Sequence, residues 1–337
     1  TTLTVEASDR TLIIEAWYPA DEPADDPQSI LNFEDSESGR NALDELIQAA
    51  PADCVTTPTQ SLRDGVAAAD LSALPLVIFS HCHNCGRYSS FSLAERLASH
   101  GMVVLSMDHA GPQPFTAEAA GEPLNVAQLQ RRATDIQTLL EVALNGSLFA
   151  RSEATRALTI DVNRVGLFGH SFGSVTVGLV AQNDPRVRAV AGLAAPMENI
   201  LLPGVTMSEI NAPVLFVLAE ENNSILEIGN DFIRQNFESA NPPVWQVDLA
   251  DAGHWSVSDL CGLNEGFSAG CGKGTRHSVD RAGEPFDYMP VRRGIRLTQN
   301  ILAAFFLGYL NDRSDALESF ATLDEESDVR VHSKPSL

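Results

Sequence analysis

The chain has 337 residues, of which 44% are hydrophobic, and it carries a formal net charge of −23 at pH 7. A surface this acidic repels phosphate backbones, so we do not expect nucleic acid as a partner. No apolar run reaches the roughly 18 residues that a membrane span needs, so we expect no membrane span either. The first ten residues lack the basic start and the apolar core of a signal peptide, so we expect either a cytoplasmic protein or one that has already lost its signal.

Strands and helices are predicted in alternation along the chain. Residues 2–20 alternate apolar and polar side chains like a β-hairpin, and the polar residues 21–40 follow as a surface excursion. Further strands are expected at 74–80, 102–111, 164–171, 186–196, 212–220 and 243–254, and helices at 91–101, 124–146, 172–182 and 294–310. This alternation predicts an α/β fold with a mostly parallel, doubly wound sheet and helices on both faces.

The sequence contains no linker long enough to separate two folded domains. We therefore expect a single domain over residues 1–312, with loop insertions at 21–70 and 255–293. Residues 313–337 are mostly polar, and we expect them to form a loosely packed C-terminal tail.

The chain contains five cysteines, at Cys54, Cys82, Cys85, Cys261 and Cys271. An odd count means that at least one thiol is free or joined to another molecule. Cys261 and Cys271 bracket a glycine-rich loop that is poor in core-forming residues, so we expect a disulfide between them. Such a bridge favours export to an oxidising compartment, whereas reduced and buried cysteines would favour the cytoplasm.

Residues 81–85, HCHNC, place four side chains that can bind zinc in one short stretch. Their spacing is poor for that purpose, because the adjacent His81 and Cys82 cannot easily reach one tetrahedral ion. No second pair of ligands follows at the spacing of a zinc site. We therefore expect no metal here and no other cofactor.

Residues 169–173, GHSFG, match G-x-S-x-G between a predicted strand and a predicted helix. Such a turn needs small residues on both sides of Ser171 and pushes its Oγ out at the carboxyl end of the sheet. The helix that follows points its N-terminus at developing negative charge. We predict that Ser171 is a nucleophile, with an ordinary glycine-rich turn as the alternative.

A serine nucleophile needs a base, and His254 is the predicted one. It follows the last predicted strand, which is the final place in the chain order serine, acid, histidine. The acid that orients the imidazole should follow the strand at 212–220. We predict Glu220 for this role, with Glu221 and Glu198 as alternatives.

Three runs of the chain carry a resemblance to a known family: LPLVIFSHCHNCGRYSSFSLAERLASHGMVVLSMDHAG, RVGLFGHSFG and DAGHWSVSDLC. They resemble the predicted dienelactone hydrolase and platelet-activating factor acetylhydrolase-like branch of the α/β-hydrolases, to which bacterial cutinase-like polyester hydrolases are related. The resemblance runs from about residue 10 to about residue 310. It implies the α/β-hydrolase fold and secreted or periplasmic ester hydrolysis without a metal. It also implies an oxyanion hole made by the main-chain N–H groups of His83 and Phe172.

The sequence departs from the pattern of that family in two ways. Cys82 stands where the family has the glycine of S-H-G, and a disulfide from Cys82 to Cys85, or from Cys54 to either, would stiffen the loop. Asn222 and Asn223 stand where the family has its aspartate. An amide cannot carry the charge of a triad acid, so either a nearby glutamate has the role or catalysis is weakened.

The expected function is that of a serine carboxylic-ester hydrolase that forms an acyl-enzyme on short-acyl esters or polyester-type substrates. Trp255 and Phe172 either form apolar walls for the substrate or simply pack. The partner is then a small-molecule or polymeric ester, and the sequence does not indicate an oligomeric state. The alternatives are a non-catalytic or weakly catalytic binding protein on a hydrolase fold, and a lactone or amide hydrolase with the same triad.

Overall fold

The computed structural model describes residues 1–337 except 8, 9, 23–25, 35, 55, 56, 70, 110, 113, 261–269, 336 and 337. The strands are β1 (Thr2–Glu6), β2 (Thr11–Trp17), β3 (Leu74–Ser80), β4 (Val103–Met107), β5 (Ile160–His170), β6 (Val187–Leu193), β7 (Val214–Ala219), β8 (Val244–Leu249), β9 (Lys273–Thr275), β10 (Pro285–Asp287) and β11 (Val329–Lys334). The α-helices are α1 (Glu37–Ala49), α2 (Phe91–Ser99), α3 (Ala117–Ala120), α4 (Val126–Leu144), α5 (Phe172–Asn183), α6 (Leu226–Ser239), α7 (Val291–Leu310) and α8 (Ser314–Asp324). Short 3₁₀ helices lie at Ile30–Phe33, Phe149–Arg151, Met207–Glu209 and Val279–Arg281.

Among the described residues, nine strands form one sheet in the order β1-β2-β4-β3-β5-β6-β7-β8-β11. The six strands from β4 to β8 in this order run parallel, whereas β1, β2 and β11 join the two edges in antiparallel pairs. Strands β9 and β10 form a separate hairpin. The predicted α/β-hydrolase fold, with a mostly parallel doubly wound sheet, is confirmed.

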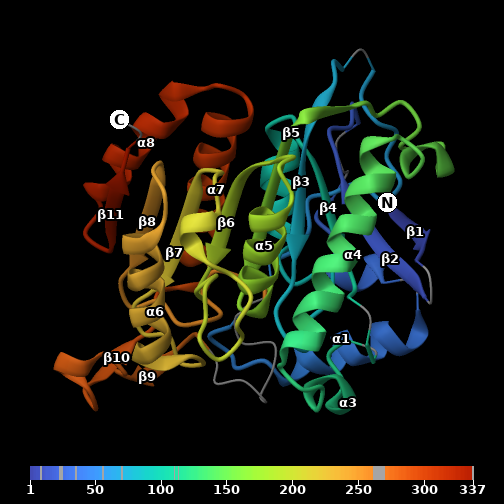
Figure 1. The fold of residues 1–337 in the computed structure, drawn as a ribbon. Helices are drawn as coiled ribbons and strands as arrows, with labels where there is room; N and C mark the ends of the chain where they lie inside the picture. The colour runs from blue at the N-terminus through green and yellow to red at the C-terminus, as the bar shows by residue number, and fades with distance from the viewer. Residues whose placement is uncertain are drawn as a thin grey trace.

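Helices cover both faces of the sheet (Figure 1). Side chains alternate between the two faces of a strand, so Leu76 and Ile78 of β3 pack into one core cluster with α4 and α5. Val77 and Phe79 of the same strand pack into the opposite cluster with α2 and α7. A strand that is buried on both faces reads as an unbroken apolar run, which is why residues 74–80 were recognisable in the sequence.

The predicted loose tail is wrong. Its strand β11 pairs with β8 and completes the edge of the sheet, and helix α8 packs beside α7 (Figure 1). Phe320, Leu323 and Val329 bury their side chains in the cluster that contains α7. Helix α1 lies within the predicted insertion at 21–70. Across the described residues, no helix combines the length and apolar character needed to cross a membrane.

Candidate active site

The predicted elbow is present at the junction of β5 and α5. Ser171 has φ 57° and ψ −122°, a left-handed conformation that is strained for a residue with a side chain. The flanking glycines are required by space: a Cβ at Gly169 would overlap the carbonyl of Gly173, and one at Gly173 would overlap the carbonyl of Ser80. The main-chain N–H of Ser171 donates to the carbonyl of Leu193 at 3.0 Å. This geometry presents the hydroxyl at the carboxyl end of β5.

His254 lies beside the elbow and is buried. Its carbonyl accepts a hydrogen bond from Nε2 of His170, the residue before Ser171, at 2.8 Å, and the two imidazole centroids are 4.9 Å apart. Its main-chain N–H donates to Oδ1 of Asn223 at 3.0 Å, and its Nδ1 is 3.0 Å from Oδ1 of Asn222. The structure therefore brings the predicted base against His170, the residue directly before the predicted nucleophile.

The predicted acid, Glu220, does not contact His254 in the structure. Its Oε2 accepts from the main-chain N–H of Asp251 at 3.3 Å, and Asn222 occupies the place on Nδ1. The physical reason lies in the backbone after β7: the N–H of Glu220 still pairs with Leu249 of β8, so the chain turns toward the base only afterwards. An amide therefore stands where a carboxylate was expected.

The two alternative acids are also engaged elsewhere. Glu221 is fully buried, and its carboxylate forms an ion pair with Arg276 at 2.8 Å. Arg276 and two hydrogen bonds from the backbone and side chain of residues 277–278 hold the pKa of Glu221 below its usual value against the opposing effect of burial. Glu198 accepts from the main-chain N–H of Met207 at 2.8 Å. Glu221 thus binds the segment at 276–278, and Glu198 binds the backbone at Met207.

Both imidazoles near the elbow are poorly basic. Burial lowers the pKa of His254 well below its ordinary value, and the neighbouring His170 lowers it further. Burial also lowers the pKa of His170 to about 4, although its bond to the carbonyl of His254 opposes the shift. Both rings are therefore neutral near pH 7, which is the state that a general base needs.

The loop at residues 81–85 is closed by a disulfide between Cys82 and Cys85, which the sequence left as one of several options. The two Cα atoms are 5.2 Å apart, and both side chains are buried. His83 lies inside this ring, with its Nε2 3.4 Å from the carbonyl of Ala120. His83 and Phe172 both line one cavity of about 60 Å³. The structure thus brings the two predicted oxyanion residues to the same space.

A buried polar cluster, which the sequence did not reveal, lies beneath this loop. Nη2 of Arg132 donates to the carbonyl of His81, and the Arg132 guanidinium lies 4.7 Å from the ring centroid of Phe172. His109 joins Asp135 through Nδ1 and Ser80 through Nε2, each at 3.0 Å. Ser80 is fully buried, so this second serine is shielded from substrate.

Arg132 and Asp135 could have been found by one signal in the sequence. They lie three residues apart on the predicted helix at 124–146, among apolar residues that face the core. Burial lowers the pKa of Arg132 to about 9, and Asp135 opposes the shift. The guanidinium therefore still carries its charge at neutral pH.

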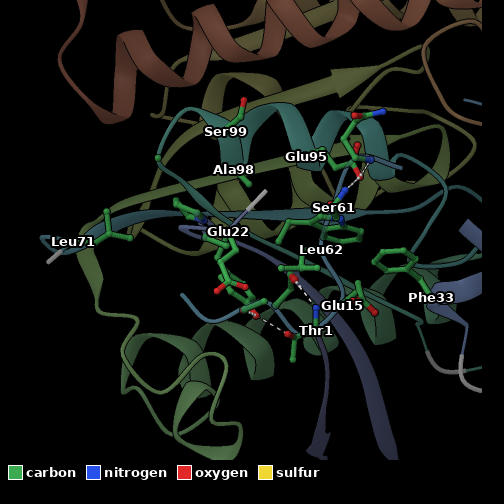
Figure 2. A pocket seen from close by; sticks show the side chains of 18 residues that line it. Thr1, Glu15, Glu22, Phe33, Ser61, Leu62, Leu71, Glu95, Ala98 and Ser99 are labelled. Carbon is green, nitrogen blue, oxygen red and sulfur yellow. Dashed lines mark hydrogen bonds and ion pairs between the residues drawn. The ribbon is translucent and has the colours of Figure 1, made fainter. Parts of the chain in front are cut away.

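A second cavity, of about 430 Å³, lies away from the elbow (Figure 2). Its wall includes Leu71 and Gly101, which precede β3 and β4, so it opens toward the amino ends of those strands. Among its carboxylates, Glu95 accepts from the hydroxyl of Ser61 at 2.8 Å. The residues of the elbow and the base do not line it, and we do not assign the chemistry to it.

The comparison with known families agrees with this geometry. A model described as the dienelactone hydrolase family matches residues 68–256, more than half of the chain. The chain belongs to the dienelactone hydrolase family. A model described as platelet-activating factor acetylhydrolase, isoform II, matches residues 2–119. The resemblance expected from the sequence is confirmed.

Curated relatives of this member of the dienelactone hydrolase family share only part of their length with it. Platelet-activating factor acetylhydrolase of Canis lupus familiaris is 25% identical over 202 residues, which are 49% of this chain and 44% of that protein. The protein of the same name from Bos taurus is 25% identical over 181 residues, which are 43% of this chain and 40% of that protein. The matches thus span less than half of each relative.

A solved structure shares the fold over almost the whole chain. The ferulic acid esterase from Streptomyces cinnamoneus superposes with a TM-score of 0.65 and 21% identity, covering 93% of this chain and 89% of that one. At this identity the likeness concerns the fold.

Two further predictions for this family member need correction. Cys271 forms its disulfide with Cys54, with Cα atoms 5.6 Å apart, and not with Cys261, which lies outside the described residues. The reason is that residues 53 and 54 lie against the segment at 271–272, far away in sequence. Trp255 is only 3% exposed and packs edge-on to His254 at 5.0 Å, which favours the alternative that it simply packs over a role as a substrate wall.

Proposed function

We propose that this chain is a serine carboxylic-ester hydrolase in which Ser171 attacks the ester carbonyl and His254 accepts the proton of Ser171. The observation that carries the proposal is the strained serine of the elbow with a neutral, buried histidine held beside it. Membership of a hydrolase family supports the same reaction class. The names of its relatives, an acetylhydrolase and an esterase, support an ester as the substrate.

In the proposed reaction, His254 acts on the hydroxyl of Ser171, while His83 and Phe172 bind the oxygen of the ester carbonyl. Nε2 of His254 takes the Oγ proton while Oγ attacks, and the carbonyl oxygen becomes an oxyanion between the N–H groups of His83 and Phe172. The imidazolium then gives its proton to the leaving alcohol, and water releases the acyl group by the same steps. The N-terminus of α5, which begins at Phe172, adds a favourable dipole for the oxyanion.

We propose short-acyl esters or polyester-type esters as substrates. The cavity of about 60 Å³ next to the elbow is lined by His83 and Phe172 but not by Ser171 or His254, so it supports only a small group on the oxyanion side. Two consecutive aliphatic side chains, Ile200 and Leu201, are 77% and 78% exposed on the segment that follows β6, at the same end of the sheet. They offer an apolar surface to a longer or polymeric leaving group. The net charge of −23 disfavours anionic substrates.

A secreted or periplasmic location belongs to the same proposal. Two disulfides, Cys54–Cys271 and Cys82–Cys85, join buried cysteines. Disulfides of this kind persist in oxidising compartments and are rare in the cytosol.

One observation favours a second candidate, a binding protein or weak catalyst on the hydrolase fold. Asn222 stands where a triad acid is expected, which removes a charge from the site. A lactone or amide hydrolase would use the same nucleophile and base, because the chemistry up to the acyl-enzyme is shared.

The test is a substrate panel with a matched blank. We expect the wild-type protein to hydrolyse p-nitrophenyl acetate or butyrate and Ser171→Ala to lose this activity, while the exposed Ser239→Ala keeps it. A fluorophosphonate probe should label Ser171 alone. Phospholipid esters, lactones and polyester films in the same panel identify the substrate class. Full activity in Ser171→Ala, or labelling elsewhere, would reject the proposed nucleophile.

A further inference from the structure

Among the described residues, the groups that hold the proposed base, His254, by hydrogen bonds are uncharged. Its Nδ1 faces Asn222, its main-chain N–H donates to Asn223, and its carbonyl accepts from His170. In a Ser-His-Asp triad, the place on Nδ1 belongs to a carboxylate that orients the ring and stabilises the imidazolium. Among the described residues, no carboxylate makes a hydrogen bond or ion pair with His254.

Three contacts fix which end of the Asn222 amide faces the ring. Nδ2 donates to the carbonyl of Ala194 at 2.9 Å, and Oδ1 accepts from the N–H groups of Ser224 at 3.3 Å and Ile225 at 3.1 Å. A flipped amide would set Nδ2 against two donors and Oδ1 against a carbonyl, so the oxygen faces the ring. An oxygen acceptor requires the proton of His254 to be on Nδ1, which leaves Nε2 free to accept one.

The carboxylates around the base are already bonded to other groups. Glu221 and Asp251 form ion pairs with Arg276 at 2.8 and 2.7 Å. Further titratable groups among the described residues of these elements include Glu220 after β7, Glu198 after β6, Asp259 on the following loop and His170 at the end of β5. The three carboxylates among them accept from main-chain N–H groups, and the fourth group is the ring already described.

We propose that Asn222 is the positioning residue of an uncharged triad: its amide oxygen holds the Nδ1 proton of His254 while Ser171 passes its own proton to Nε2. The inference rests on the proposed function, because it concerns how that base is held. It replaces the expectation that an amide in this place means a disabled site. The orientation and the tautomer of the ring are both supplied by the amide.

The absence of a countercharge on Nδ1 has a consequence for pH. When Oγ bonds to the carbonyl carbon, its proton moves to Nε2 and the electron pair of the C=O bond moves to the oxygen. Among the described residues, the group on Nδ1 of this imidazolium is the uncharged amide of Asn222, and the backbone of Ala194 opposes the lowering of the pKa of His254 by burial and by His170 without cancelling it. The base then stays unprotonated at lower pH than a base in a charged triad does, and the activity extends further into the acid range.

The experiment is the pH profile of kcat/KM for p-nitrophenyl acetate in Asn222→Asp and Asn222→Ala. An opposite charge within about 4–6 Å raises a pKa by about 1–3 units, so we expect the acid limb of Asn222→Asp to move up by about one pH unit or more. Asn222→Ala should lose about a hundredfold or more in kcat, with no upward movement of the limb. Both variants lose the bond to Ala194, so the loss of stability that they share cannot explain a difference between their profiles.

The matched control is Asn223→Asp, which makes the same change one residue further, against the main-chain N–H of His254. It should move the acid limb less than Asn222→Asp does. An equal shift in both variants would attribute the effect to a nearby charge and overturn the inference. An unmoved limb in Asn222→Asp, or wild-type kcat in Asn222→Ala, would also overturn it. So would loss of activity in Glu220→Gln, because a carboxylate would then have the role.

The failure of this inference is distinguishable from failure of the proposed function. If Ser171→Ala keeps the wild-type activity, the nucleophile is wrong and both proposals fail. If Ser171→Ala is inactive while Asn222→Asp leaves the acid limb in place, the ester hydrolase stands and only the uncharged triad fails.

Discussion

The two sides of the site hold their working groups by different means. On the side of the substrate carbonyl oxygen, residues 81–85 form a disulfide-closed loop that rests on the buried guanidinium of Arg132. On the side of the base, His254 is held by amides such as Asn222 and by the neutral ring of His170. Covalent and charged restraints therefore lie where negative charge develops during attack, and neutral ones lie where positive charge develops.

The difference teaches which tasks need a charge. Donors to an oxyanion stabilise it best when they are fixed before the reaction, because they then need no reorganisation. The base needs a defined tautomer and orientation, and a correctly placed acceptor supplies both without a charge. We therefore expect the rate to depend on the geometry of both sides, and the pH dependence to depend on whether the third member of the triad carries a charge.

The largest expected effect comes from removing the proposed N–H donor. His83→Pro should lower kcat about a hundredfold or more, because it removes one oxyanion donor. His83→Ala keeps that N–H and should stay within about tenfold of the wild type. The measurement is kcat for p-nitrophenyl acetate, with and without EDTA or phenanthroline. Activity lost to a chelator, or an equal loss in both variants, would give the side chain of His83 a role as a ligand instead.

The second effect concerns the cation beneath the loop. Arg132→Met removes a charged donor to the carbonyl of His81, which is worth about 1.5–3 kcal/mol, so kcat should fall by about ten- to a hundredfold while KM changes little. Arg132→Lys keeps the charge and should recover part of the loss. A fall in KM and kcat together, with no recovery by lysine, would show that the residue only supports packing. Thermal melts of both variants show whether the loss of activity follows a loss of folding stability.

The third effect sets one disulfide against the other. Cys82→Ala/Cys85→Ala should lower kcat by about tenfold, because a loop displaced by a fraction of an ångström aligns its donors poorly. Cys54→Ala/Cys271→Ala should keep kcat and instead lower the free energy of unfolding by about 2–5 kcal/mol, because that bridge closes a much longer loop. The two double variants are compared by kinetics and by denaturant unfolding. If the Cys54/Cys271 variant lost kcat and the Cys82/Cys85 variant lost only stability, the Cys82–Cys85 disulfide would have no role in positioning the oxyanion donors.

The smallest effect concerns Asp259, a carboxylate of the base side that is turned away from His254 toward helix α2, where its Oδ2 accepts from the N–H of Ser92 at 2.9 Å. Burial raises its pKa to about 7. A folded-state pKa above the unfolded value means that the folded protein binds the proton more tightly, so stability is highest at low pH and falls as pH rises through about 7. The melting temperature should therefore fall as the pH rises from about 4, the usual pKa of an aspartate, to about 7 and level off above that, and Asp259→Asn should flatten this slope. An unchanged slope in that variant would assign the pH dependence to other groups.

The sequence predicted the strands and helices of this fold well because strands that are buried on both faces form unbroken apolar runs. The strand expected at 74–80 has the bounds of β3, and the helix expected at 172–182 ends within one residue of α5. The prediction of a loosely packed tail was wrong because the apolar residues Phe320, Leu323 and Val329 are isolated in a polar stretch. Only the position of the edge of the sheet shows that they share a buried face.

The sequence predicted those residues of the site that belong to a recognisable motif or chain order. Ser171 lies in a G-x-S-x-G motif and His254 follows it in the order serine, acid, histidine, and the structure places His254 against His170, the residue before the serine. The third position could not be predicted from residue type, because a triad normally has a carboxylate there and the turn after β7 decides which of residues 220–223 meets the ring. Arg132 and Asp135 were missed because charges on a helix are normally solvated, and the burial of that face depends on the loop above it.

Strand β11 has a consequence for how molecules of this protein meet one another. Its polar sequence, with Arg330 and Lys334, covers the otherwise open hydrogen-bonding edge of β8. Charged and short outer strands discourage the edge-to-edge pairing that leads to aggregation. A chain shortened before β11 would present Val244–Leu249 as a bare, mostly apolar edge to its neighbours. Such a chain should self-associate as its concentration rises, even with every group around Ser171 still in place.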